Sequence, residues 1–143
     1  MRALLDINVL IALFDTGHQF HARARTWLEA HIGEGWASTP LTQNGFVRVI
    51  SQPEYPNQVS TAQAIERLRD ATQSPYHVYW PDDVSIVDPA RFDPTRIHGP
   101  KQLTDVYLLA IAVRQGGCFA TFDERISLSA VPGATAEHLR IVK

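Results

Sequence analysis

Three aspartates stand where a buried acidic side chain is costly, and together they are suited to holding a cation. Asp6 follows the apolar run 3–5 and precedes the mostly apolar run 7–14. Burying a charged carboxylate in such a stretch costs roughly several kcal/mol of desolvation free energy unless the group is paired or bound to a metal. Asp105 begins a helix-like run, and Asp123 follows a strand-like run. The pattern predicts one cation shared by the three acids.

Three carboxylates in one pocket indicate hard-cation chemistry, because Mg²⁺ and Mn²⁺ prefer oxygen ligands. A bound cation of this kind can polarise a phosphodiester and help to deprotonate an attacking water. A single acid of this type would more often cap a helix, since helix N-termini stabilise a carboxylate by roughly 0.3–1 kcal/mol. Three acids in equivalent positions favour a metal site over three separate caps.

The surrounding sequence alternates short apolar strands with helices. Strands are predicted at 2–5, 35–39, 77–80, 118–121 and 139–142. Helices are predicted at 7–14, 18–32, 40–51, 61–73 and 103–115, with a further helical turn near 84–92. Ser60 and Gln63 form a capping-box pattern at the start of the fourth helix. The alternation indicates an α/β fold with a mostly parallel five-stranded sheet. Ligands of such sheets lie beyond the carboxyl ends of the strands, so the three acids could meet in one pocket.

Length and composition limit the remaining possibilities. We expect a single domain over residues 1–143, with 45% hydrophobic residues forming its core. The one cysteine, Cys118, excludes an internal disulfide and a cysteine-based zinc cage. A net charge of −2 gives no strongly basic footprint for nucleic acid. No apolar run reaches the roughly 18 residues of a membrane span, and no signal-peptide cleavage site follows the first residues, so we expect a cytoplasmic protein without a membrane association.

Four blocks of the sequence together resemble a PIN-domain ribonuclease, and among these a VapC-type toxin of bacterial toxin–antitoxin pairs. The blocks are LLDINVLIALF at 4–14, TPLTQNGFVRVIS at 39–51, LTDVYLLAIAVRQGG at 103–117 and ATFDERI at 120–126. The resemblance implies a PIN-like three-layer fold and cleavage of RNA with Mg²⁺ (or Mn²⁺). It also implies a homodimer and inhibition by a cognate VapB-like antitoxin. By position, it makes Asp6, Asp105 and Asp123 the catalytic, metal-binding acids.

The chain departs from the family at one position. The family usually has a further acid, typically glutamate, early in the third helix, and the matching residue here is Gln43 or, less well, Asn44. An amide oxygen can still hold a cation or its water, so we expect Gln43 to complete the catalytic set. The lost charge should weaken metal affinity or shift which of two metal sites is filled.

Several other residues are candidates for supporting roles. Asn8 and Thr121 could orient the acids by hydrogen bonding. Arg48, Lys101 and Arg125 could contact phosphates, although a structural ion pair or a solvated surface charge is the alternative for each. The aromatic residues are interpreted as core or dimer-interface side chains rather than as base-stacking platforms: Phe20, Trp27 and Trp36.

Two other functions stay open. The Gln43 departure could mark a binding module that holds RNA or a protein partner but cleaves poorly. A phosphoryl-transfer enzyme could instead use Asp6 as its nucleophile. The second alternative is weaker, because the usual pattern has another acid two residues later, where this chain has Asn8.

Overall fold

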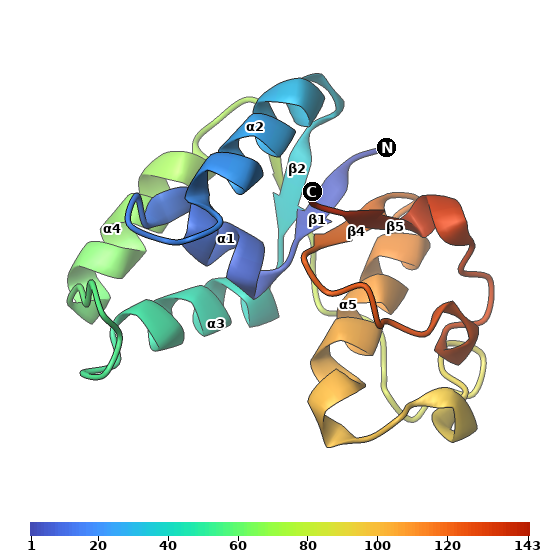
Figure 1. Cartoon of the computed structure of the whole chain (residues 1–143). Coiled ribbons are helices and arrows are strands. Elements are labelled where there is room, and N and C mark those ends of the chain that lie inside the picture. Colours follow the sequence, from blue (N-terminus) through green and yellow to red (C-terminus); the bar gives the residue numbers. More distant parts are fainter.

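A five-stranded, wholly parallel sheet lies at the centre of the computed structural model, which describes residues 1–143 (Figure 1). Its strands are β1 (Ala3–Leu5), β2 (Trp36–Ser38), β3 (His77–Tyr79), β4 (Cys118–Thr121) and β5 (Leu139–Ile141). They lie in the order β3-β2-β1-β4-β5, so that β1 is central. Leu5 of β1 pairs with Ala120 of β4, and this register brings Asp6 beside Thr121. The predicted α/β class with a mostly parallel five-stranded sheet is confirmed.

Helices cover both faces of the sheet, which gives three layers. They are α1 (Ile7–Phe14), α2 (His21–His31), α3 (Pro40–Ile50), α4 (Thr61–Thr72) and α5 (Leu103–Arg114). Figure 1 shows α1 to α4 on one side of the sheet and α5 on the other. Short 3₁₀ helices occupy Ile32–Glu34, Pro94–Arg96, Pro100–Gln102, Leu128–Ala130 and Ala136–His138.

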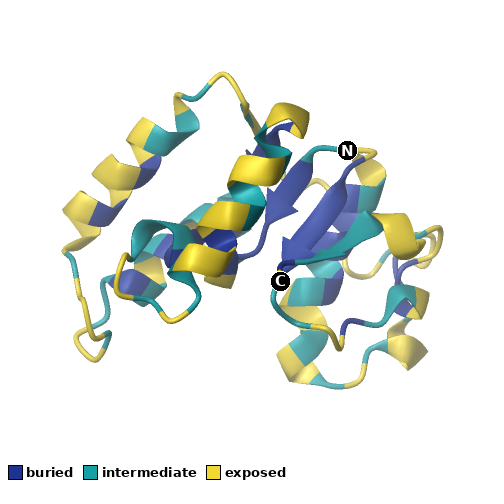
Figure 2. Cartoon of the chain, turned by 45° about the horizontal axis from the view of Figure 1, so that its top comes forward, coloured by how far each residue is buried: buried dark blue, intermediate teal, exposed yellow.

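The core has two halves, one on each face of the sheet. Side chains alternate along a strand, so Ala3 and Leu5 face the α1, α3 and α4 side, while Leu4 between them faces α5. All three are buried, as expected for a central parallel strand (Figure 2). Each fully buried leucine contributes about 1.5–3 kcal/mol of transfer free energy to folding. This burial fixes β1 in the sheet and so fixes the backbone position of Asp6, the residue that follows it.

The helices begin and end close to the predicted positions, with one difference. The second helix starts at His21 rather than near residue 18, because residues 16–20 form turns. The predicted helical turn near 84–92 is found as a single turn at 88–92, where the backbone N–H groups of Arg91 and Phe92 donate to the carbonyl oxygen of Asp88 at 3.0 and 3.1 Å. The capping box of Ser60 and Gln63 is confirmed, with both reciprocal hydrogen bonds formed.

No helix has the length and apolar character needed to cross a membrane.

Candidate active site

Asp6 lies immediately after β1 and is only 6% exposed. Its backbone N–H donates to the carbonyl oxygen of Ala120 at 3.0 Å, which extends the sheet by one residue. Thr121 donates its hydroxyl to Oδ2 of Asp6 at 2.7 Å. The carboxylate makes no capping hydrogen bond to α1, so helix capping does not account for this acid. Burial raises the pKa of Asp6, although the hydrogen bond from Thr121 partly offsets that rise.

Asp105 lies in the first turn of α5, the helix that packs on β4 and β1. Burial, followed by the charges of Asp6 and Asp123, raises the pKa of Asp105 to about 7. A like charge raises the pKa of a carboxyl group only when it is near. The strand ends and the start of α5 therefore bring the three acids into one electrostatic neighbourhood, as the topology predicted.

Asp123 differs from the other two acids because it has a cationic partner. Oδ1 of Asp123 accepts hydrogen bonds from the backbone N–H of Arg125 at 2.8 Å and from its Nε at 3.1 Å. These bonds, the side-chain one first, lower the pKa of Asp123. The backbone N–H of Asp123 donates to Oγ1 of Thr121 at 3.1 Å. Hydrogen bonds therefore fix both the backbone and the carboxylate of Asp123. Arg125 compensates the charge of Asp123, whereas Asp6 and Asp105 have no cationic partner.

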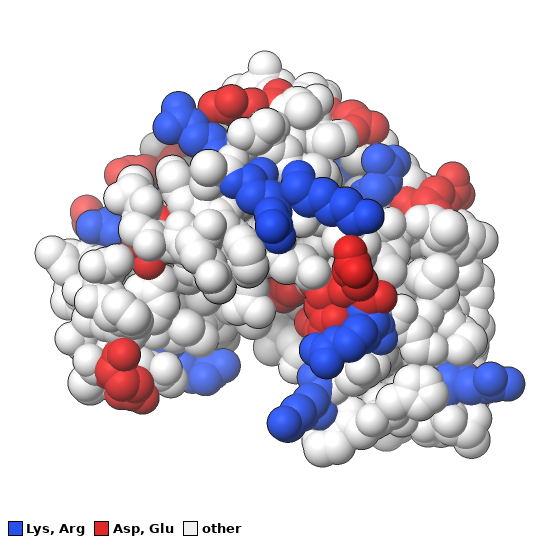
Figure 3. All heavy atoms as spheres, in the orientation of Figure 1, with Lys and Arg blue, Asp and Glu red and all other residues white.

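The three acids open onto one cleft of about 570 Å³. Its lining residues come from the ends of β1 and β4 and from the starts of α1, α2 and α5: Asp6, Asn8, Arg23, Asp105, Thr121, Phe122, Asp123, Glu124 and Arg125. Figure 3 shows a group of acidic side chains on this face, with basic side chains on two sides of it. We call the cleft that the nine residues named above line the acid cleft.

The donor atoms of the acid cleft fit a hard divalent cation, although the carboxylates do not converge on one position in this structure. No three His, Cys, Asp or Glu side chains converge closely enough to hold a metal ion, and Asp123 is turned onto Arg125. The acid donors of the cleft are nevertheless all oxygen atoms, which Mg²⁺ and Mn²⁺ prefer. Asp6 and Asp105 form no ion pair, and burial is the largest cause of the raised pKa of each, so no protein cation compensates the negative charge that they carry when ionised. A bound divalent cation would compensate it.

Gln43 does not lie in the acid cleft, contrary to the sequence-based expectation. Its Nε2 donates to Oγ of Ser38 at 3.0 Å, and Ser38 is also bonded to Nε2 of His77 at 2.8 Å. Gln43 also lines a hollow between α3 and α4, together with Ile65 and Leu68. The side chain that stands where the family has its further acid therefore contributes to the helix packing here.

The other candidates divide between the cleft and the rest of the surface. Arg125, Asn8 and Thr121 line the cleft. Arg48 lies exposed on α3 and Lys101 lies exposed in the 3₁₀ helix before α5, and neither lines the cleft.

Three further residues of the cleft, Arg23, Phe122 and Glu124, were not predicted as site residues from the sequence. Arg23 and Arg25 lie on the same helix, and nothing in the local pattern shows which of them faces the acids. The packing of α2 beside the end of β4 decides this. Phe122 could have been found from its position between Thr121 and Asp123, two residues already identified as candidates.

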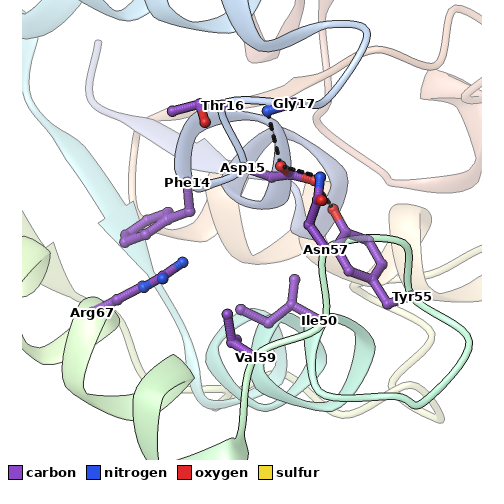
Figure 4. Close-up of a pocket in the computed structure, with 9 residues that line it drawn as sticks. All are labelled: Phe14, Asp15, Thr16, Gly17, Ile50, Tyr55, Asn57, Val59 and Arg67. Carbon is purple, nitrogen blue, oxygen red and sulfur yellow. Dashed lines mark hydrogen bonds between the residues drawn. The ribbon is translucent and has the colours of Figure 1, made fainter.

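Another acid, Asp15, lies in a separate hollow of about 320 Å³ at the end of α1 (Figure 4). Its carboxylate accepts hydrogen bonds from the Tyr55 hydroxyl, from Asn57 at 3.1 Å and from the backbone N–H of Gly17 at 3.0 Å. Burial would raise the pKa of Asp15, but these hydrogen bonds outweigh it and lower the pKa. All of these donors come from the surrounding loops, so this acid joins the loop after α1 to the loop after α3.

Comparisons with known proteins agree with this architecture. The family described as PIN domain matches residues 3–132. Ribonuclease VapC44 of Mycobacterium tuberculosis is 58% identical over 139 residues, which cover 97% of this chain and 98% of that protein. Ribonuclease VapC39 of the same organism is 42% identical over 135 residues, covering 93% and 96%. A crystal structure of VapBC2 from Rickettsia felis bound to a promoter DNA fragment aligns over both whole chains with a TM-score of 0.60. Its 11% identity supports the fold alone.

Proposed function

We propose that this chain, which belongs to the PIN-domain family and within it to the VapC-type ribonucleases, is an endoribonuclease that hydrolyses RNA phosphodiesters. One observation carries the proposal: Asp6, Asp105 and Asp123 share one cleft, and two of them have no cationic partner. Relatives that cover nearly the whole chain are named ribonucleases. The acid cleft is the place where that chemistry can occur.

Asp6, Asp105 and Asp123 would hold Mg²⁺ or Mn²⁺ in this cleft. The cation would polarise the scissile phosphodiester and lower the pKa of an attacking water. Thr121 orients Asp6 by donating to Oδ2. Arg125 balances the charge of Asp123 and stands at the cleft, where a phosphate could take the place of the carboxylate as its partner.

We extend the proposal to the biological role of a toxin that acts on cellular RNA and is neutralised by a cognate VapB-like antitoxin. The names of the relatives support this role, because each is a VapC. A homodimer is also expected. Light scattering of the purified chain, alone and with the product of a neighbouring antitoxin gene, measures both assemblies.

A binding module without efficient cleavage is the second candidate. The ion pair between Arg125 and Asp123 favours it, because it occupies one of the three carboxylates, and no three-acid metal site is already formed.

RNA cleavage by the purified protein separates these two functions. Total RNA is incubated with wild type in Mg²⁺, in Mn²⁺ or in EDTA, and the new ends are mapped. Asp6→Asn is the inactive variant, and Asp70→Asn, an exposed acid on α4, is the matched control for loss of one charge. We expect discrete cleavage that requires the metal and is abolished only by Asp6→Asn. Equal cleavage by Asp6→Asn would contradict the proposal, and no cleavage by wild type would favour the binding module.

A further inference from the structure

Arg23 is an exposed arginine on the wall of the acid cleft, and it forms no ion pair. The six salt bridges of the structure involve other residues, although four acids line the same cleft. The guanidinium carbon of Arg23 instead lies 4.4 Å from the centroid of the Phe20 ring. This arginine is therefore placed by an aromatic ring rather than by a carboxylate.

The ring under Arg23 is itself fixed to the strand that carries the site. Phe20 packs against Phe122, with 5.0 Å between ring centroids. Phe122 lies between Thr121 and Asp123, so its backbone is positioned by the end of β4. Two contacts hold the start of α2: Nδ1 of His21 lies 2.7 Å from the carbonyl oxygen of Ala12, and the next turn buries Ala24. Arg23 therefore has a defined position relative to the acids.

Stacking on an aromatic face leaves the edge of a guanidinium free. The cation–π contact uses the face of the group, whereas its N–H donors point outward in its plane. Such an edge matches two oxygens of a phosphate in a bidentate pair. The carboxylates of the cleft repel the RNA backbone, so a fixed cation on the wall also offsets that repulsion.

We propose that Arg23 is a substrate-positioning residue that binds a backbone phosphate of RNA beside the phosphodiester that is cleaved. The inference rests on the proposed ribonuclease function. Arg25 supplies the contrast within the same helix. It is bonded to Glu29 at 2.9 Å and does not line the cleft, so its charge is already paired and faces elsewhere.

RNA binding, measured in the cleavage-deficient Asp6→Asn background, tests the proposal. The probe is a fluorescent single-stranded RNA that contains a cleavage site mapped with wild type, and anisotropy is followed over a range of salt concentrations. Arg23→Ala should raise the dissociation constant roughly tenfold, because one charge-assisted phosphate contact is lost. It should also reduce the slope of log K against log[salt] by about 0.7, the value for one single-strand phosphate contact. Arg23→Lys should keep the slope and lose only part of the affinity. Arg25→Ala should change neither quantity.

Several outcomes would overturn the assignment. The assignment is overturned if Arg23→Ala binds RNA with the affinity and salt slope of the Asp6→Asn parent. It is also overturned if Arg25→Ala loses as much RNA affinity as Arg23→Ala. If Arg23→Ala lost antitoxin binding but kept RNA binding, Arg23 would be a contact for the protein partner and not for RNA. Thermal unfolding checks that each variant is folded, and Arg23→Lys keeps the test valid if the alanine variant is unstable. Wild type that cleaves no RNA would instead overturn the ribonuclease function on which the proposal depends.

Discussion

Thr121 joins two acids of the cleft through one oxygen atom. Its Oγ1 donates to Oδ2 of Asp6 at 2.7 Å and accepts from the backbone N–H of Asp123 at 3.1 Å. Thr121 is fully buried at the end of β4, and the register of β4 with β1 places it beside Asp6. The orientation of the Asp6 carboxylate is therefore coupled, through Thr121, to the position of the Asp123 backbone.

Replacing Thr121 by valine keeps the shape of the side chain and removes the shared hydroxyl. Asp6 loses the bond that lowers its pKa, so its carboxylate is harder to ionise and less well oriented. We expect Mn²⁺ affinity, measured by calorimetry, to fall roughly tenfold, as is usual when a group that orients a metal ligand is removed. Thr121→Ser, which keeps the hydroxyl, should stay near wild type. Unchanged affinity in the valine variant would show that the hydroxyl does not support the site.

The metal-free protein should lose stability as the pH rises through the titration of Asp105. Its pKa is raised from 3.8 to about 7 in the folded chain, so the folded state binds this proton more tightly than the unfolded state. The resulting stabilisation is fully present below about pH 4 and is lost as the pH rises to about 7. Thermal unfolding in EDTA between pH 5 and 8 should show this decline in wild type and a flatter profile in Asp105→Asn. Identical profiles for the two proteins would contradict the assigned environment of Asp105.

Arg125 should compete with the metal for Asp123. Removing the guanidinium in Arg125→Gln frees a carboxylate and removes a positive charge from the cleft. We expect Mn²⁺ to bind several-fold more tightly to this variant in calorimetry, because a nearby positive charge opposes cation binding. Arg114→Gln is the matched control, since Arg114 is bonded to Asp83 at 3.1 Å and does not line the cleft. Weaker metal binding by Arg125→Gln would instead mean that Arg125 holds Asp123 in its metal-binding position.

Restoring an acid at position 43 should not tighten the metal site. Gln43 is bonded to Ser38 and lies in the hollow between α3 and α4, so the carboxylate of Gln43→Glu would stand apart from the acid cleft. We expect its Mn²⁺ affinity to stay within about twofold, and its stability to fall by about 0.5–1.5 kcal/mol through loss of the amide hydrogen bond. A tenfold gain in metal affinity would place residue 43 in the site.

The fold and the three acids could be predicted from the sequence because both depend on the backbone. Apolar runs of strand length, the Ser60–Gln63 capping box and the alternation of elements gave the order of strands and helices. In a parallel sheet, the carboxyl ends of neighbouring strands meet at one edge, which places Asp6 near Asp123.

The rest of the site depends on side-chain orientation, which no spacing rule supplies. Gln43 starts from the predicted helix, yet its amide is bonded to Ser38 and the residue does not line the acid cleft. Arg125 could have pointed to solvent or to a phosphate, and it folds back on Asp123. The choice between Arg23 and Arg25 follows from how α2 packs against the end of β4, a tertiary contact between Phe20 and Phe122.

The most direct test of the account is single-turnover cleavage of one mapped RNA, with the protein in excess and Mg²⁺ varied. Wild type is compared with Asp6→Asn, Asp105→Asn and Asp123→Asn, and Asp70→Asn serves as the charge-matched control outside the cleft. We predict that each cleft variant loses at least about a hundredfold in the cleavage rate, equivalent to about 2.7 kcal/mol of the barrier, while Asp70→Asn keeps the wild-type rate. Wild-type rates in any of the three cleft variants would contradict the claim that these acids form one metal-dependent catalytic site.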